Sequence, residues 1–294
     1  MIRTLVTGAN GQVGSEIRYL AAEYPKFDFI FTDYKELDIT DEAAVLKFFS
    51  AHQIDYCINC AAYTKVDKAE FEVVNAHKVN VKGIKNLAVA CQQYQVPLIH
   101  LSSDYVYHSD QNTPLKEDDA TEPKSVYART KLEGELLAQS IHPRCTIVRT
   151  SWVYSSFGKN FVKTMLRLGQ ERQQLQVVYD QIGAPTYARP LAKAILSMIK
   201  KIAAAKVSAS KASGIFHYSN EGVTSWYDFA RAIFELEDMK IDVLPIETKD
   251  YPTPALRPHF SLLDKTKIKT TFNIEIPHWR DSLKACLQAL KVEV

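Results

Sequence analysis

Long apolar runs, an excess of charge of one sign and a paired set of cysteines are all missing from this chain of 294 residues. No stretch of about eighteen consecutive apolar residues occurs, so we expect no transmembrane helix. The 36 basic and 34 acidic residues leave a formal net charge of +2, which argues against nucleic acid or an anionic membrane as a partner. The first strand-like run begins at Ile2, which leaves no room for a signal peptide and favours a cytoplasmic location.

The cysteines are few and irregularly placed. Most lie in apolar runs, so we expect buried free thiols in a reducing compartment rather than disulfides. Cys57 and Cys60 form a Cys-x-x-Cys pair, but it lies in the strand-like run YCINCAA, without the helix start or second ligand pair that a redox or metal motif needs. We therefore predict structural thiols and no metal site. The set is Cys57, Cys60, Cys91, Cys145 and Cys286.

A glycine-rich turn at the start of the chain is the strongest local signal. The strand-like run Ile2–Val6 is followed by GANGQVG and then by a helical pattern. In a strand–turn–helix unit that holds a dinucleotide, Gly8 permits the tight turn, Gly11 lets the backbone approach the diphosphate, and Gly14 lets the helix pack closely on the strand. The amino terminus of that helix then offers free N–H groups to the phosphates.

Asp33 completes this pattern. It ends the next apolar run, Phe27–Phe31, about twenty residues after the last glycine. A carboxylate at this point can accept hydrogen bonds from an adenosine ribose. The sequence therefore predicts a dinucleotide-binding site.

Short β-rich runs and helical patterns alternate through residue 150, which predicts an α/β fold of the Rossmann type, with a doubly wound parallel sheet and its ligand at the carboxyl ends of the strands. Hydrophobic residues make up 46% of the chain, enough for a sizeable core. The predicted strands are Ile2–Val6, Phe27–Phe31, Asp55–Cys60, Val96–Ser102 and Cys145–Thr150, and the helices begin at about Gln12, at Thr40 or Asp41, at Glu72 (to Tyr94) and at Ser125 (to Ser140).

The second half is less regular and is rich in proline near its end. We predict an NAD(P)-binding domain over residues 1–155, and mainly a smaller substrate-binding lobe over 156–294, with segments that can return to the first domain. Residues 203–214 are expected to form an exposed helix end or loop. The predicted elements are helices over Asn160–Gln173, Pro190–Ala205 and Trp226–Glu237, and strands over Leu175–Val178, Ile215–Ser219 and Asp242–Ile246.

Tyr127 and Lys131 are the candidate catalytic pair. Four residues apart on a helix, they share one face. A lysine ammonium there is expected to lower the phenol pKa and so to suit it for general acid catalysis. Ser102 and Ser103 lie at the end of the preceding strand, where a hydroxyl can hold a substrate carbonyl beside a hydride donor.

These residues resemble a family, the extended short-chain dehydrogenase/reductases. The resemblance lies in GANGQVG, in the hydroxyl at Ser103 and in YARTK as the Tyr-x-x-x-Lys element. It implies that Asn80, on the long helix before the fourth strand, serves the proton relay and the cofactor site.

Longer stretches resemble one branch of that family, the nucleotide-sugar reductases that produce dTDP-L-rhamnose. The resemblance implies NADPH- or NADH-dependent reduction of the C4 ketone of dTDP-6-deoxy-L-lyxo-4-hexulose. It implies hydride from the nicotinamide, a proton from Tyr127, a ketone oriented by Ser103, and a Lys131 that tunes the phenol and binds the nicotinamide ribose. The stretches are LDITD, AAYTKVDKAE, SSDYVY, VYARTKLEGE, RTSWVY, NFVKTML, DQIGAPTYA and RPHFSLLD.

The same resemblance assigns binding residues by position. Ser103, Asp104 and Trp152 match substrate positions, and Arg257 is a candidate for the nucleotide diphosphate because guanidinium pairs well with phosphate. The positions that match the cofactor site are Gly8, Gly11, Gln12, Val13, Gly14, Asp33, Asp38, Ile39, Ala62, Tyr63, Thr64, Asn80, Leu101, Tyr127 and Lys131.

The chain also departs from the family pattern. His108-Ser109 replaces the usual Asp-Gly type of turn after SSDYVY. Some members of the family form a homodimer that is bridged by a metal held by carboxylates. Glu16 matches one of these carboxylates, but Arg189 stands where a second is needed, so we predict no metal site. A homodimer remains a possible partner state. Asp33 would repel a 2′-phosphate and favours NADH, whereas Lys35 could accommodate NADPH.

Two other functions are compatible with these motifs. One is a reductase or epimerase that uses the same tyrosine and lysine on another nucleotide sugar. The other is a non-catalytic, dinucleotide-binding regulatory subunit of the same fold, which could dispense with Tyr127, Lys131 and Ser103. All three are present, which favours the enzyme.

Overall fold

A parallel sheet forms the centre of the computed structural model, which describes residues 1–292. Its six strands lie in the order β10-β5-β4-β3-β1-β2. The elements of the first half are β1 (Ile2–Thr7), α1 (Gln12–Leu20), η1 (Ala21–Glu23), β2 (Phe27–Thr32), α2 (Glu42–Ala51), β3 (Tyr56–Asn59), α3 (Val66–Ala69), α4 (Val73–His77), η2 (Lys78–Gly83), α5 (Ile84–Gln93), β4 (Leu98–Ser103), η3 (Asp104–Val106), α6 (Val126–Ile141) and β5 (Cys145–Thr150).

The second half contains short strands, helices and one strand of the main sheet. Its elements are β6 (Val153–Tyr154), α7 (Phe161–Glu171), β7 (Gln174–Val178), β8 (Ile182–Gly183), β9 (Thr186–Tyr187), α8 (Ala188–Ala203), α9 (Ala209–Ala212), β10 (Gly214–Tyr218), β11 (Thr224–Ser225), α10 (Trp226–Leu236), β12 (Asp242–Ile246), η4 (Thr248–Asp250), α11 (Thr266–Phe272) and α12 (Trp279–Val292).

The order of the strands reverses at β1. The chain passes from β1 outward to β2, and then crosses back to β3 on the other side of β1. The crossing helices therefore lie on opposite faces, and the loops at the carboxyl ends of β1 and β3 diverge. This is where an open parallel sheet binds its ligand.

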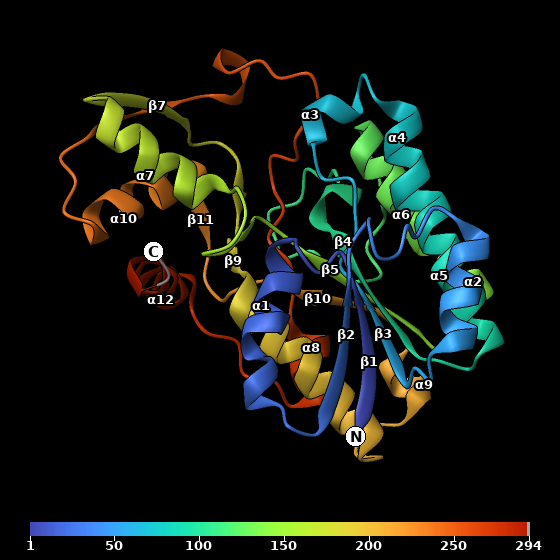
Figure 1. The fold of residues 1–294 in the computed structure, drawn as a ribbon. Helices are drawn as coiled ribbons and strands as arrows, with labels where there is room; N and C mark the ends of the chain where they lie inside the picture. The colour runs from blue at the N-terminus through green and yellow to red at the C-terminus, as the bar shows by residue number, and fades with distance from the viewer. Residues whose placement is uncertain (293–294) are drawn as a thin grey trace.

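Helices cover both faces of the sheet (Figure 1). Successive side chains of a strand point to opposite faces, so Leu5 and Val6 of β1, both 0% exposed, enter different cores. Val6 packs in the core beneath α1 and α8, and Leu5 in the core beneath α2 and α5. The predicted α/β fold with a doubly wound parallel sheet is confirmed.

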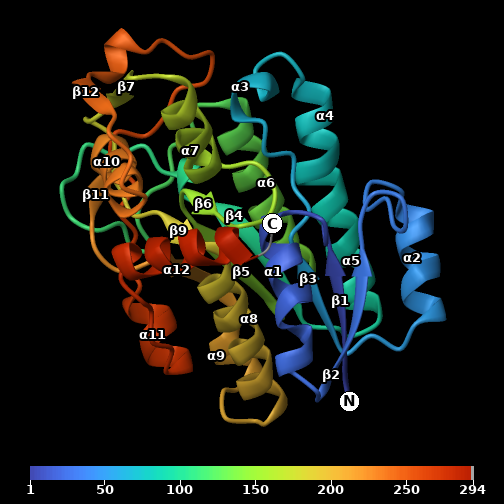
Figure 2. The same ribbon diagram turned by 60° about the vertical axis from the view of Figure 1, so that its left-hand side comes forward.

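A second lobe lies beyond the carboxyl end of the sheet (Figure 2). Helices α7, α10 and α12 share a core with β7, in which Phe229 and Leu283 are fully buried. The short strands pair as β12 with β7, β11 with β8, and β6 with β9. Segments of the second half also join the first: β10 pairs with β5, and α8 packs against α1.

The predicted helix over Glu72–Tyr94 contains an irregularity that its periodicity does not reveal. Between α4 and α5 the backbone forms a π-helical segment, η2, which includes Asn80. The short helices α3 and α9 were also not predicted, since four residues are too few to show a period. Of the two candidates for the cap of α2, Asp41 is the residue that accepts from the Ala44 amide, at 3.0 Å.

None of the helices within residues 1–292 is both long and apolar enough to span a membrane.

Candidate functional site

A cavity of about 1040 Å³ opens at the carboxyl ends of β1 and β3, where the strand order reverses. It brings together the glycine turn, the end of β2, the loop after β3, the end of β4 and the start of α6. The predicted cofactor residues that line it are Gly8, Gly11, Gln12, Val13, Asp33, Asp38, Ile39, Ala62, Tyr63, Thr64, Leu101, Tyr127 and Lys131.

The glycine turn has the close approaches that require glycine. Gly8 has a φ of +64°, and a Cβ there would lie 2.5 Å from the Ala61 amide nitrogen. A Cβ at Gly14 would lie 2.6 Å from the Ala9 Cα, so this residue shapes the turn from behind and does not line the cavity. No side chain caps the first turn of α1, which leaves its N–H groups facing the cavity. This cradle fits a diphosphate.

Asp33 holds the turn after β2 against the glycine turn. Its two carboxylate oxygens accept from the amides of Asn10, at 2.9 Å, and Tyr34, at 2.7 Å. Asp38 accepts from both the amide and the hydroxyl of Thr40. Both carboxylates line the cavity, where a ribose or an adenine would lie if a dinucleotide were bound.

Asn80 is buried behind the loop of residues 62–64. Its Oδ1 accepts from the Tyr63 amide at 2.8 Å, and its Nδ2 donates to the Tyr63 carbonyl and to the Thr130 hydroxyl. The π-helical segment turns this side chain toward α6. Asn80 therefore joins the loop to the helix that carries Tyr127, and it does not itself line the cavity.

Tyr127 lies at the cavity and is buried. Burial raises its pKa to about 12, the Ser103 hydroxyl opposes this rise, and the neighbouring Asp104 adds to it. The expected lowered pKa is wrong: desolvation is the largest cause and raises it, while Nζ of Lys131 contacts the Leu101 carbonyl and His100. At neutral pH the phenol is therefore protonated.

Ser103 and Asp104 form a buried pair beside this phenol. The Ser103 hydroxyl donates to Asp104 Oδ1 at 2.9 Å. Burial raises the pKa of Asp104 to about 6, with the Ser103 hydrogen bond acting against it. Oδ2 of Asp104 lies near Ser261 but has no hydrogen bond of normal geometry within residues 1–292.

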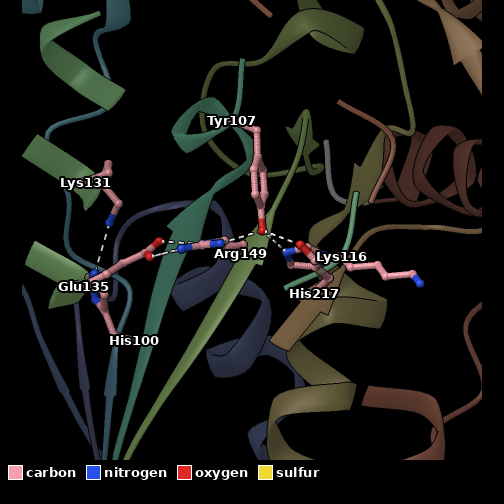
Figure 3. A network of polar contacts seen from close by, with 7 residues as sticks. All are labelled: His100, Tyr107, Lys116, Lys131, Glu135, Arg149 and His217. Carbon is pink, nitrogen blue, oxygen red and sulfur yellow. Dashed lines mark hydrogen bonds and ion pairs between the residues drawn. The ribbon is translucent and has the colours of Figure 1, made fainter. Parts of the chain in front are cut away.

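Lys131 reaches from α6 to the end of β4 (Figure 3). Its Nζ donates to the Leu101 carbonyl at 2.7 Å and lies 3.2 Å from Nε2 of His100. The other ring nitrogen of His100 lies 2.9 Å from Nδ2 of Asn59. Burial lowers the pKa of Lys131 to about 8, and the nearby Glu135 carboxylate opposes this fall.

A buried ion pair lies one turn further along α6 (Figure 3). Arg149 of β5 donates to both oxygens of Glu135, with its closest contact at 2.6 Å, and the side chains are only 2% and 1% exposed. Its third nitrogen donates to the Tyr107 hydroxyl at 2.5 Å, and this hydroxyl lies 2.8 Å from Nε2 of His217. The network fixes α6 to the sheet.

Trp152 lies in the loop after β5, outside the residues that line the cavity. Its backbone has a φ of 48°, which is strained for a tryptophan. Its ring stacks on Trp226 at 3.7 Å between centroids and 10° between planes. Gly183 covers part of the indole, since a Cβ there would lie 3.0 Å from it.

Arg257 is engaged by another side chain. It donates to both oxygens of Asp67, at 3.0 and 2.7 Å, and to the Ala255 carbonyl. This ion pair holds the proline-rich segment of the second lobe against α3. Among the residues that the structure describes, Arg257 therefore serves as a link between the lobe and the sheet domain.

Glu16 lies where the resemblance places one carboxylate of a bridging metal site. It is 0% exposed, and its Oε2 accepts from Nε of Arg189 at 2.6 Å. Its Oε1 accepts from the Ser155 hydroxyl. Within residues 1–292 no cluster of three or more His, Cys, Asp or Glu residues could hold a metal ion.

The cysteines carry no disulfide in the part of the chain that the structure describes. Cys57 is buried in the sheet, whereas Cys60 lines the cavity beside the glycine turn. Burial raises the pKa of the Cys60 thiol to about 12, so it remains protonated at neutral pH. The prediction of buried thiols holds for the other cysteines, whereas Cys60 is only half-buried because it follows the last residue of β3 and faces the cavity.

Several polar residues at the cavity were missed from the sequence. Lys65, Lys78 and Lys159 line it and add positive charge that suits phosphate groups. Lys65 directly follows the predicted residues Ala62–Thr64, so its position next to them could have identified it as a cavity residue. The other two come from segments whose approach to the cavity only the fold reveals.

Asn59 and His100 were also missed. They sit at corresponding positions of β3 and β4 as polar residues within apolar strands. Polar residues within otherwise apolar strands could have identified both as candidates for a buried polar network.

The comparisons with known proteins agree with this geometry. The sequence model of the family described as "RmlD substrate binding domain" matches residues 2–292. A dTDP-4-dehydrorhamnose reductase from Aggregatibacter actinomycetemcomitans is 41% identical over 291 residues, which cover 97% of this chain and 98% of that protein.

Two solved structures are similar over nearly the whole chain. A dTDP-4-dehydrorhamnose reductase from Clostridium acetobutylicum has a TM-score of 0.92 and 39% identity, covering 98% of this chain and 99% of the other. The enzyme of the same name from Bacillus anthracis, described as a complex with NADP, has a TM-score of 0.91 and 37% identity, with the same coverage.

Proposed function

Since the chain belongs to the RmlD substrate binding domain family, we propose that it is a dTDP-4-dehydrorhamnose reductase. It would use NADPH or NADH to reduce the C4 ketone of dTDP-6-deoxy-L-lyxo-4-hexulose to dTDP-L-rhamnose. One observation carries the proposal: a single cavity at the reversal point of the sheet contains the glycine turn, Asp33, Tyr127 and Lys131. A dinucleotide site and an acid–base pair in the same cavity are what a ketoreductase requires.

The cofactor would lie along the carboxyl edge of the sheet. The uncapped start of α1 and Gly11 would hold its diphosphate, and Asp33 its adenosine ribose. When bound, the nicotinamide supplies the hydride. The Asp33 carboxylate disfavours a 2′-phosphate, whereas the related Bacillus anthracis enzyme is described with NADP, so the proposal includes both cofactors.

The proton would come from Tyr127. Its raised pKa keeps the phenol protonated at neutral pH, which is the state that a general acid needs before the ketone is reduced. Ser103 lies beside the phenol and would hold the ketone oxygen. Its present acceptor, Asp104, keeps the Ser103 side chain buried at the end of β4 and aims it at this corner.

The sugar nucleotide would lie between the sheet domain and the second lobe. Trp152 and Trp226 offer a rigid aromatic surface on which the C–H groups of a sugar can pack. Arg257 would donate hydrogen bonds to the diphosphate and would give up one of its hydrogen bonds to Asp67 in doing so. We keep the proposed boundary at residue 155, with β10 and α8 as the segments that rejoin the sheet domain.

A cytoplasmic location and a homodimer are further parts of the proposal. Glu16 is paired with Arg189, so the proposed homodimer does not depend on a bridging metal at this carboxylate. Light scattering with and without a chelator tests both points. The molar mass should be that of a dimer, and the chelator should not change it.

The decisive assay follows the oxidation of NADPH and, separately, NADH with the 4-keto sugar nucleotide as substrate. Tyr127→Phe should lower kcat by about 10²- to 10⁴-fold and leave the cofactor Kd unchanged. Tyr94→Phe, at the residue that caps the C-terminus of α5, is the matched control and should behave like the original protein.

Cofactor binding without turnover would contradict the proposed substrate. Turnover of another 4-keto sugar nucleotide would then identify a different reductase or epimerase of this family. Failure with every such sugar would point to the non-catalytic regulatory subunit.

A further inference from the structure

A row of polar side chains crosses the sheet beneath the cavity. Thr7 of β1 pairs in register with Asn59 of β3, and Asn59 with His100 of β4. Residues in register on adjacent strands point to the same face. Lys131 reaches the row from α6, so the three adjacent strands β1, β3 and β4 and the helix α6 contribute one side chain each.

The orientation of the Asn59 amide is determined by its neighbours. Its Oδ1 accepts from the Ala61 amide at 3.0 Å and from the Thr7 hydroxyl at 2.7 Å. A backbone N–H can only donate, so the atom facing it must be the amide oxygen. Nδ2 is then the atom that faces His100, and it too can only donate.

This orientation selects the tautomer of His100. Nδ1 must accept from Asn59 Nδ2 at 2.9 Å, so the proton of the neutral ring is on Nε2. Burial, the larger cause, lowers the pKa of His100 well below its ordinary value even without a charge on Lys131, so the ring does not gain a second proton. Nε2–H is therefore a donor, and it lies 3.2 Å from Nζ of Lys131.

A lysine ammonium cannot accept this hydrogen bond. It has three N–H donors and no lone pair, whereas a neutral amine has a lone pair that can accept from His100 and a proton that can go to the Leu101 carbonyl. The charged groups nearby do not reverse this preference. Glu135 favours the ammonium, but both of its oxygens already accept from Arg149, and Tyr127 is protonated at neutral pH.

We propose that His100 is a positioning residue for Lys131: its Nε2–H donates to Lys131 as a neutral amine, and protonation of the lysine breaks this contact and turns Nζ toward the cavity. The proton comes from solvent and binds to the Nζ lone pair, so no other group changes its charge. The row Thr7–Asn59–His100 thus determines when the lysine becomes a cation. Its consequence for catalysis rests on the proposed function, because a cationic Lys131 is what would stabilise the phenolate of Tyr127.

The test is an NMR titration of the purified protein, with labelled histidine and lysine and without cofactor or substrate. His100 should show the Nε2–H tautomer from pH 6 to 10 (assigned with His100→Gln), and Lys131 Nζ should titrate near the pKa of about 8, well below the exposed lysines. A His100 ring with its proton on Nδ1, or a Lys131 that stays an ammonium to about pH 10, overturns the proposal.

Asn59→Asp reverses the direction of the hydrogen bonds. A carboxylate accepts from Ala61, from Thr7 and from the Nδ1–H of His100, which frees Nε2 to accept from an ammonium. His100 should change tautomer, and the titration of Lys131 should move up by at least about one pH unit. An unchanged tautomer in this variant contradicts the proposal.

Thr7→Val is the matched control. It removes one donor to Asn59 Oδ1, but the Ala61 amide still determines the orientation of the side chain, so the tautomer of His100 should not change. A change of tautomer here would also count against the proposal. These measurements need no substrate, so a failed reductase assay and a failed tautomer prediction are separate results.

Discussion

Trp152 adopts a backbone conformation that tryptophan rarely occupies, with a φ of 48°. Such strain persists only where surrounding contacts impose it, and residues of this kind cluster at ligand sites. The stacked ring of Trp226 supplies the main contact, and Gly183 leaves room for the indole on its other edge. At the scale of single residues, the proposed substrate surface therefore depends on three positions that are distant in the sequence.

Trp226→Ala should raise KM for the sugar nucleotide by about 2- to 10-fold, since an aromatic pair contributes roughly 0.5–1.5 kcal/mol. The KM for the cofactor should not change, because Trp226 is not among the residues that line the cavity. Steady-state kinetics with each ligand varied in turn measure both values. Trp226→Phe keeps a ring and should recover most of the loss; equal effects on both KM values would contradict this role.

At the scale of elements, the position of α6 decides the geometry of Tyr127 and Lys131, the proposed catalytic pair. The helix packs against the π-helical segment η2 and against α5. Gly134 permits this approach, since a Cβ there would collide with the Asn80 carbonyl oxygen and lie 2.8 Å from Cγ2 of Ile84. The widened turn at η2 in return aims Asn80 at Tyr63 and Thr130. Two helices thus place the loop and the tyrosine together.

Gly134→Ala should move α6 away from η2. We expect a loss of about 1–3 kcal/mol in the free energy of unfolding, as for other overpacked contacts, together with a lower kcat. Urea denaturation and steady-state kinetics measure the two effects. Leu136→Ala, on the exposed face of the same helix, should change neither by much. A fully active and stable Gly134→Ala protein would show that α6 can shift without consequence.

The ion pair between Arg149 and Glu135 joins β5 to α6 in the interior. Arg149→Leu should lower the free energy of unfolding by about 3–5 kcal/mol, because the carboxylate is left buried without its partner. The double variant Arg149→Leu/Glu135→Leu should be more stable than this single variant, since no buried charge remains. Urea denaturation of the original protein, the Arg149→Leu variant and the double variant gives the three free energies of unfolding. A double variant that is less stable than Arg149→Leu would contradict the prediction that the unpaired carboxylate is the cause of the loss.

At the scale of the whole molecule, buried histidines couple stability to pH. Burial and the nearby Arg149 lower the pKa of His217 to about 3, whereas an unfolded histidine titrates near 6.5. The unfolded chain therefore binds more protons below pH 6.5. The stability that the neutral His217 contributes is complete above that pH and is lost as the pH falls toward the folded pKa.

His217→Gln should accordingly reduce the loss of stability on acidification. Between pH 6.5 and about 4.5 the difference should amount to roughly 2–3 kcal/mol. Thermal denaturation of both proteins across this range gives the measurement, with the slope against pH as the relevant quantity. Parallel slopes would show that His217 does not contribute to the acid sensitivity.

The local parts of the site could be read from the sequence because short-range geometry determines them. A strand, a glycine turn and a helix place Gly8 and Gly11 whatever else the chain does. A spacing of four on a helix puts Tyr127 and Lys131 on one face. The alternation of strands and helices was enough to predict the doubly wound sheet.

What the tertiary structure alone decided involves partners from separate elements. The register of β1, β3 and β4 aligns Thr7, Asn59 and His100, and Lys131 contacts this row from α6 through His100. Packing of the second lobe stacks Trp152 on Trp226 and pairs Arg257 with Asp67. Spacing along the chain carries the identity of a catalytic group, but its protonation and its contacts depend on burial and on neighbours that only the folded chain brings together.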